Sequence, residues 1–587
     1  MPTPEHSRTQ RTADLLWPLG VGMLTGWVCL YLFLVYVLTH GGKIQGWQSV
    51  VWVLGTLGGV IAVVGSRKSV AGIIYQLRIS LTLTVVGLAV PVLFSWILGH
   101  FTDFSWDGMT SRGITVRNLM RGDPALNTYP FGHVLAGFLA HITGSWQGGK
   151  GINLALIWIC FCFVFPTLQV LNFSDWKLWF LSIVTALNPV AVYQISCFQI
   201  DGHVASLITC LLFSMLRILA SGPVRLEGLL ALVSAFTASA ACKTSGVFYA
   251  IIIDGIFLLF LAGVTRSWRR VLLLFVVAIA VSWPLGVYIR SIGQYAPLNL
   301  GYLGSATNIE SQGYGVGSGA SHIKALKKLD RIQQFIVSSC SYMEIIPEGI
   351  RLKPPFWMQR RELRAVEELT PDPRAGGFGP YFSTSIFLAG VGCLILVIQG
   401  QKNYWPSWFM LLSAGASAFG SQVWWARWTP QSWLLLIAML MYVITVGSKS
   451  LRVDGLIGTG MRWLGGLACL ATGINVFLVT LYYFVGMGKQ EKILNLQIEL
   501  AAKLQTPVLI NVPVIQEGHN TGASFKASKW WFVDRGVPIM ELQQEPPRPR
   551  MKIHKTETRF PLPPDWRISL RSPEDESLFR EKNLIED

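Results

Sequence analysis

Charged residues are scarce in this chain of 587 residues. They make up 14% of it, whereas ordinary soluble domains carry about 25%. Hydrophobic residues make up 52%, with 23 Trp and 31 Phe, and the mean hydropathy is +0.46. So much apolar surface with so few charges needs lipid around it. The composition excludes disordered and collagen-like classes and predicts a polytopic membrane protein.

Cysteine is also sparse, and its placement excludes a disulfide scaffold. The nine cysteines include no CxxC pair, and all except Cys340 lie within or at the ends of apolar runs. The sequence also contains no Walker A motif, no HExxH and no GxSxG. We therefore expect the cysteines to fill space between packed helices rather than to bind metal or form disulfides.

Long apolar runs recur along the chain, and each is long enough to cross a bilayer as a helix. They indicate an all-α polytopic membrane protein with about thirteen transmembrane helices. The predicted helices lie near 15–38, 46–65, 79–99, 151–171, 177–196, 202–220, 227–242, 246–264, 270–289, 384–399, 405–420, 431–447 and 463–486. The first run is too long for a cleaved signal peptide, so we expect it to be retained.

The net charge of +16 is explained by basic residues in short segments between the predicted helices. Basic short loops remain in the cytoplasm. With thirteen spans, this rule places the N-terminus in the cytoplasm and the C-terminus outside. The long outer loops contain no N-x-S/T tripeptide, so we expect the membrane to be the plasma (inner) membrane of a bacterium. The basic clusters are Arg67/Lys68/Arg78, Arg217/Arg225, Arg266/Arg269/Arg270, Lys402 and Lys449/Arg452/Arg462. No nucleic-acid motif is present, so nucleic acid is not an expected partner.

The predicted topology divides the chain into three parts. Residues 1–78 hold the N-terminal transmembrane helices, 79–486 form the transmembrane core, and 487–587 form an extracytoplasmic tail. Two polar segments on the outer side, the 100–150 loop and the 290–383 loop, interrupt the core. The tail contains the strand-like run TPVLINVPV and then KWWFVDRGVPIMEL, which predict a small α/β appendage.

Two acidic residues open the 100–150 loop at the expected outer membrane boundary. In HFTDFSWDGMT, Asp103 and Asp107 are four residues apart with Trp106 between them. On a helical turn they would share a face. Carboxylates beside aromatic rings at an interface are costly to ionise and can act as bases. The other interpretation is that one of them simply caps an interfacial helix.

A carboxylate-bearing outer loop in an apolar polytopic chain resembles the GT-C superfamily of membrane glycosyltransferases, of the mannosyltransferase type. These enzymes use polyprenyl-phosphate-linked sugars as donors. The WDG at Trp106–Gly108 is similar to the WD-type variants of their loop motif, and NPVAVYQ, QIDGH, CKTSG, GGFGP and WWARWTPQ are similar in kind. The resemblance covers roughly residues 80–490 and not the tail. One departure is that the carboxylate loop here follows the third predicted span instead of the first.

The resemblance implies an inverting transfer of the sugar to a hydroxyl group on the outer face. Asp107 would be the base, and Asp103 would orient the acceptor or share a divalent cation, Mg²⁺ or Mn²⁺, with Asp107. The leaving lipid phosphate needs cations at the membrane boundary. The candidates for that role are Arg427, Lys243 and Arg290. For each of them the alternative is a side chain that snorkels to the interface.

Four more residues are candidates for substrate binding: Asp201, His203, Trp425 and Tyr129. Asp201 and His203 belong to QIDGH, Trp425 lies in WWARWTPQ, and Tyr129 begins YPFGH. Aromatic side chains at such positions can stack on a sugar or contact a prenyl chain. The expected partners are the polyprenyl-phosphate-sugar donor, membrane lipids, and a glycan, lipid or protein acceptor.

Two other functions remain open. A transporter or flippase of a lipid-linked saccharide should carry charges deep within several spans and show internal repeats. Only Asp254 lies deep within a predicted span, and the sequence shows no repeat. A lipid-linked glycan ligase should instead rely on Arg and His in a late outer loop. The single deep charge and the missing repeats disfavour the transporter, and the acidic pair in the 100–150 loop disfavours the ligase.

Overall fold

The computed structural model describes most of the helical part of the chain and short pieces of the tail. The described residues are 4–39, 43, 85–87, 89–105, 108, 112–122, 130–221, 225–265, 329–343, 351–367, 376–401, 404–419, 426–449, 456–503, 508–511, 531, 533–537, 539–542, 550–551, 567–569, 577 and 585–586.

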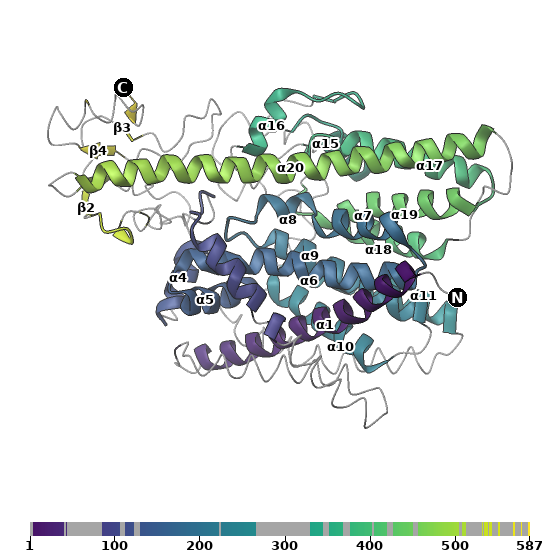
Figure 1. The fold of residues 1–587 in the computed structure, drawn as a ribbon, viewed down its shortest axis with the longest axis horizontal. Helices are drawn as coiled ribbons and strands as arrows, with labels where there is room; N and C mark the ends of the chain where they lie inside the picture. The colour runs from purple at the N-terminus through teal and green to yellow at the C-terminus, as the bar shows by residue number, and fades with distance from the viewer. Residues whose placement is uncertain are drawn as a thin grey trace.

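The described residues form a bundle of helices that run along the long axis of the molecule (Figure 1). The long helices are α1 (Pro4–Thr39), α6 (Gly151–Val170), α9 (Asp201–Ser221), α10 (Leu226–Cys242), α11 (Thr244–Thr265), α17 (Phe382–Ile398), α18 (Trp405–Phe419), α19 (Trp433–Lys449) and α20 (Leu456–Lys503). The shorter ones are α4 (Gly113–Arg121), α5 (Phe131–Thr143), η2 (Trp146–Lys150), α7 (Asp175–Ala186), α8 (Pro189–Tyr193), α15 (Arg331–Ser339), α16 (Arg360–Glu367) and η5 (Pro430–Ser432).

Six stretches of these residues are long and apolar enough to cross a membrane, as judged by length and composition. They are Thr12–Leu38, Trp146–Val170, Asp201–Ser221, Ser245–Gly263, Pro430–Gly447 and Thr459–Leu496. The protein is therefore a helical membrane protein. In lipid, a helix satisfies all of its own backbone hydrogen bonds, which explains why apolar runs and helices coincide so closely.

Most predicted spans that fall in the described residues match an observed helix within a few positions. The run 151–171 matches α6, 202–220 matches α9, and 246–264 matches α11. The predicted spans 46–65 and 270–289 lie outside the described residues.

The predicted span 177–196 is divided into α7 and α8. Asn188 stands between them, and its side chain accepts a hydrogen bond from the Val190 backbone N–H at 3.0 Å. Pro189 has no N–H to continue α7 and instead begins α8. Helix α7 therefore ends here, and a separate short helix begins at Pro189.

The predicted span 463–486 lies within α20, which is 48 residues long. At about 1.5 Å per residue, such a helix is about 72 Å long, against about 30 Å for the hydrocarbon core of a bilayer. In Figure 1, α20 runs across the whole bundle and continues past it to the strands of the tail. Its charged C-terminal half thus carries the chain from the bundle to the tail.

Helix α9 lies at the centre of the bundle. It packs against α6 and α10, and α1 packs against both of these. Every residue from Asp201 to Leu216 is buried, as expected for a helix enclosed on all sides. The charged group at the start of α9 is therefore held inside the protein.

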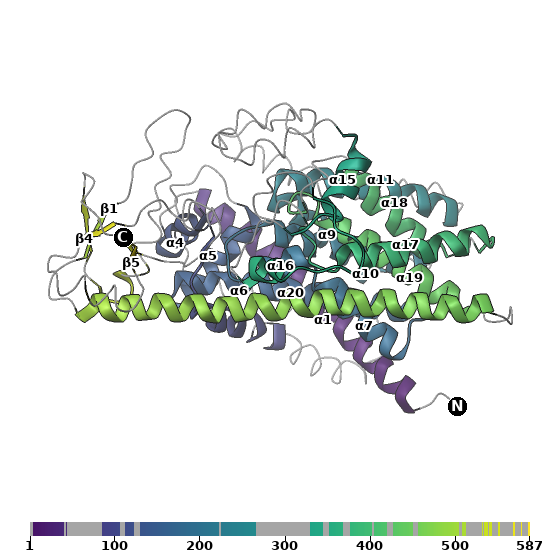
Figure 2. The same ribbon diagram turned by 90° about the horizontal axis from the view of Figure 1, so that it is seen from above.

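Five short strands are described in the tail: β1 (Val508–Asn511), β2 (Ile539–Leu542), β3 (Arg550–Met551), β4 (Arg567–Ser569) and β5 (Ile585–Glu586). They form one sheet in the order β2-β1-β4-β3-β5. The β1–β2 pair is parallel, and the other pairs are antiparallel. The sheet and the start of α1 lie at opposite ends of the long axis in both views (Figures 1 and 2).

The two ends of the bundle carry different polar groups. Asp201 begins α9 at one end, which we call the Asp201 end. Arg217, near the other end of α9, lies beside Trp17 of α1. We call this second region the Trp17 end.

Backbone contact between two helices positions the 100–150 loop. A Cβ atom on Gly151 would lie 2.4 Å from the backbone N of Ser95 and 2.5 Å from its Cα. Glycine therefore lets the start of α6 touch the helix that leads into the loop. This contact places η2 and the loop at the Asp201 end.

We expect Gly151→Ala to lower the unfolding temperature of the detergent-solubilised protein, measured by intrinsic fluorescence, because the added methyl group meets backbone atoms. The expected loss is about 1–3 kcal/mol, typical of overpacking. The matched control is Gly466→Ala in α20, where an added Cβ meets nothing within 4 Å. Equal unfolding temperatures for the two variants would contradict this account of the helix contact.

Candidate functional site

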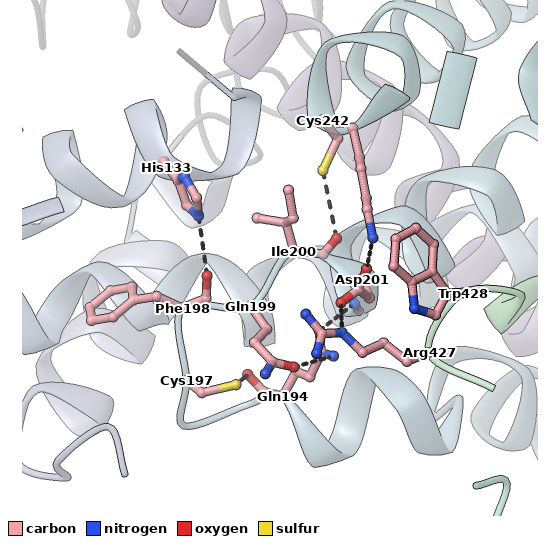
Figure 3. Close-up of polar contacts among 12 residues, drawn as sticks. His133, Gln194, Cys197, Phe198, Gln199, Ile200, Asp201, Cys242, Arg427 and Trp428 are labelled. Atoms are coloured by element: carbon pink, nitrogen blue, oxygen red, sulfur yellow. Dashed lines mark hydrogen bonds and ion pairs between the residues drawn. The ribbon is translucent and has the colours of Figure 1, made fainter. Parts of the chain in front are cut away.

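A buried carboxylate with two cations bound to it lies at the Asp201 end (Figure 3). Lys243 Nζ donates to Asp201 Oδ1 at 2.5 Å, and Arg427 Nε donates to Asp201 Oδ2 at 2.6 Å. The Asp201 side chain is 1% exposed, whereas Lys243 is 18% and Arg427 11% exposed. We call these three residues the Asp201 cluster. The carboxylate is therefore buried, whereas both cations are partly exposed to solvent.

The ends of several helices meet at this cluster. Asp201 is the first residue of α9. Lys243 is the extended residue between α10 and α11, with φ −160° and ψ 151°. Arg427 precedes η5 and α19, and η5 packs against α9. The break between α10 and α11 and the turn before α19 thus serve to bring cations to the start of α9.

The cluster carries an excess of positive charge. Lys243 Nζ lies 4.1 Å from the centroid of the Trp428 ring, a cation–π arrangement. Burial lowers the pKa of Lys243, the charge of Asp201 raises it, and the charges of Arg427 and Arg112 lower it further. Among the described residues, three cations thus act around one carboxylate. Such a group favours an added anion.

Hydrogen bonds join the loop before α9 into one unit. Gln194 Oε1 accepts from the Gly202 N–H at 2.6 Å, and Gln194 Nε2 donates to Gln199 Oε1 at 2.8 Å. From α6, Asn153 Nδ2 lies 2.7, 3.0 and 2.8 Å from three backbone carbonyls of residues 194–197. The motifs NPVAVYQ and QIDGH therefore form one rigid support for Asp201.

His203 is part of this support, since it is 3% exposed. Its Nε2 pairs with Asn153 Oδ1, and a Cβ on Gly132 would lie only 2.1 Å from its Nδ1. The neighbouring His133 places Nε2 3.2 Å from the Phe198 carbonyl (Figure 3). The structure thus brings residues 130–133 and QIDGH together, with His203 of α9 buried against α5 and α6.

Asp103 links the 100–150 loop to the same support. It is 1% exposed, its Oδ1 accepts from the Ser105 N–H at 2.8 Å, and its Oδ2 accepts from the Phe198 N–H at 2.9 Å. Burial raises the pKa of Asp103, whereas the charge of Lys150 and the bonds from Ser105 and Phe198 lower it. A Cβ on Gly108 would lie 1.9 Å from Asp103 Oδ2, so the glycine of WDG packs directly on the carboxylate.

This environment of Asp103 does not fit the expected Mg²⁺ or Mn²⁺ site. Both of its oxygens accept backbone hydrogen bonds, and Gly108 covers one of them. The described residues contain no group of three His, Cys, Asp or Glu side chains placed to hold a metal ion.

Four predicted site residues lie outside the described residues: Asp107, Tyr129, Arg290 and Trp425. Of the others, the structure brings Asp201, Lys243 and Arg427 into direct contact. The loop before α9 connects Asp103 and His203 to them, at positions where both are buried.

Sequence reasoning did not single out Trp428, Arg112 or Gln431. The first and last belong to WWARWTPQ, so that motif was the available signal, whereas nothing in the sequence marks Arg112. The Gln431 side chain is fully buried, and in the part of the chain that the structure describes its amide has no hydrogen-bond partner. An amide in this state can bind a polar substrate group.

The tail fastens the 100–150 loop. Asp534 Oδ1 accepts from Arg117 Nη2 of α4 at 2.8 Å, and Asp534 Oδ2 accepts from Trp146 Nε1 of η2 at 2.8 Å. The next residue, Arg535, donates to Glu491 Oε1 of α20 at 2.6 Å. The tail thus bridges α4, η2 and α20.

Two further contacts strengthen this bridge. Glu491 Oε2 accepts from the Thr102 N–H at 2.8 Å, next to Asp103 in the chain. Trp531 of the tail is 3% exposed, and its ring lies edge-on to Phe104 at 5.2 Å. Glu491 of α20 and Trp531 of the tail therefore contact the residues on the two sides of Asp103.

No family model matches this chain, and no curated protein or solved structure matches it either.

We expect Asp534→Ala to free the tail from the loop, because it removes the acceptor for Arg117 and Trp146 together. The expected cost is about 1–3 kcal/mol, in the range for hydrogen bonds to charged groups. Limited trypsin digestion followed by mass spectrometry should show faster cleavage near residues 526–535 than in the unaltered protein. Lys492→Ala, an exposed change on α20, is the control. Identical digestion of both variants would contradict the bridge.

Proposed function

We propose that the chain is an integral-membrane glycosyltransferase of the GT-C type. It transfers a sugar from a polyprenyl-phosphate donor to a hydroxyl group of a glycan, lipid or protein on the extracytoplasmic face. In this proposal the chain has about thirteen spans in the plasma membrane, a cytoplasmic N-terminus and an extracytoplasmic α/β appendage. The Asp201 cluster is the observation that carries the proposal.

The Asp201 cluster supports binding of a lipid phosphate for three reasons. Its cations outnumber its carboxylate, and they are more exposed than the carboxylate is. It lies where apolar helices begin, the level at which the phosphate of a membrane lipid lies. Trp428 adds an aromatic face beside Lys243, which suits a sugar ring or a prenyl chain.

The reaction is a single displacement. The acceptor oxygen forms a bond to the anomeric carbon while the bond from that carbon to the phosphate oxygen breaks, so the configuration inverts. The hydroxyl proton passes to the base, for which we propose Asp107. The electron pair of the broken bond remains on the lipid phosphate, where Lys243 and Arg427 stabilise the growing charge. Asp103 acts as a positioning residue that holds the loop carrying Asp107.

The test is transfer of radiolabelled sugar from a polyprenyl-phosphate donor by the purified protein in liposomes. We expect Arg427→Gln and Lys243→Gln to lower kcat by about 10²-fold or more, the usual effect of removing one preorganised donor to a developing charge. Arg427→Lys keeps the charge and should lose less. The control is Arg462→Gln, an exposed arginine of α20 outside the cluster.

Two results would contradict the proposal. Full activity of both glutamine variants would remove the cluster from phosphate binding, and full activity of Asp107→Asn would remove Asp107 from the base role. Movement of the lipid-linked saccharide across the liposome membrane without any product would favour a flippase instead. Unfolding temperatures of all variants, measured in parallel, separate lost chemistry from lost structure.

A further inference from the structure

A mainly apolar cavity with charged side chains among its lining residues lies at the Trp17 end, at the opposite end of α9 from the Asp201 cluster. Its volume is about 190 Å³, and it is lined by Trp17 of α1, by the C-terminal ends of α6 and α9, and by the start of α10. Val170 and Ile218 supply apolar surface, and Trp17 supplies an aromatic ring that carries one N–H group. Arg217 and Arg225 supply cations, and Glu227 supplies one carboxylate. The net charge of the described lining residues is therefore +1.

Arg217 is held in a fixed orientation. Its guanidinium carbon lies 4.3 Å from the centroid of the Trp17 ring, and its Nη1 donates to the Pro166 carbonyl at 3.0 Å. Because the guanidinium is planar and already oriented, it loses little freedom when it binds an anion. Arg225, the residue before α10, lines the same cavity and is exposed.

Two further features of the residues that line this cavity bear on what it can bind. Helix α10 begins at Leu226, and its N-cap residue Arg225 makes no side-chain capping bond. The first N–H groups of α10, including that of the lining residue Gly228, therefore present the positive end of the helix. In addition, the buried Trp17 Nε1 finds no hydrogen-bond partner within the described residues.

We propose that this cavity binds a phosphate group, and specifically the phosphate of an anionic phospholipid. Two guanidinium groups, an uncapped helix N-terminus and an indole N–H match the charge and the several acceptor oxygens of phosphate. The source is either a lipid headgroup or free phosphate. The apolar surface and the position at the ends of membrane-crossing helices favour the lipid. The proposal does not depend on the glycosyltransferase activity, because the cavity lies at the other end of the bundle.

The experiment is native mass spectrometry of the full chain in detergent with equal amounts of phosphatidylglycerol and phosphatidylcholine. We expect phosphatidylglycerol to be retained at about fivefold higher occupancy or more, corresponding to roughly 1 kcal/mol. Arg225→Gln, at an exposed position, and Trp17→Phe, which keeps the ring but removes the N–H, should each lower this preference several-fold. Arg462→Gln, a cation of α20 that does not line the cavity, should leave it unchanged.

A second arm uses inorganic phosphate alone and measures the unfolding temperature. Stabilisation by phosphate that both cavity variants abolish, without any preference for phosphatidylglycerol, would support a phosphate site and overturn its assignment to lipid. Equal retention of phosphatidylglycerol by the unaltered chain and both variants would overturn the site altogether.

Discussion

The double ion pair of Asp201 is the interaction on which the rest of the Asp201 end depends. A carboxylate that is 1% exposed must be neutralised, because removing one partner of a buried pair leaves an uncompensated charge at high cost. Lys243 and Arg427 supply the compensation from two different loops. Their contact therefore fixes where α10 passes into α11 and where the chain enters α19, and both are held to the start of α9.

From Asp201 the constraint extends outward through hydrogen bonds. Gln194 and Asn153 hold the loop before α9, and the Phe198 N–H in that loop binds Asp103. The 100–150 loop is therefore oriented by the same support as the cations. Asp534 and Arg535 add a clamp from the tail. The cations and the loop with the proposed base are thus held relative to each other, as a displacement reaction at one carbon requires.

Much of the helical fold could be predicted from the sequence. In lipid, an apolar segment must satisfy its own backbone hydrogen bonds, and an α-helix does this within one segment. The break between α7 and α8 has a local signal in the sequence, the capping residue Asn188 followed by Pro189. A prediction based on hydropathy alone does not use this signal. The length of α20 was missed because Lys489, Glu491 and Lys492 end the apolar run without ending the helix. Charged residues interrupt a run of apolar residues, but they can continue an α-helix.

The candidate site could be predicted only in part. The sequence marked Asp201, Lys243 and Arg427 separately, yet the residues of its two ion pairs are 42 and 226 positions apart, and a single sequence contains no sign of such contacts. The bridge from Asp534 to Arg117 spans 417 positions.

The most direct test of the central claim is photo-crosslinking with a polyprenyl phosphate that carries a photoreactive group beside its phosphate, mapped by mass spectrometry. We predict adducts in peptides containing Asp201, Lys243 or Arg427, and their loss in Arg427→Gln. Adducts confined to the Trp17 end, or unchanged in that variant, would contradict the account.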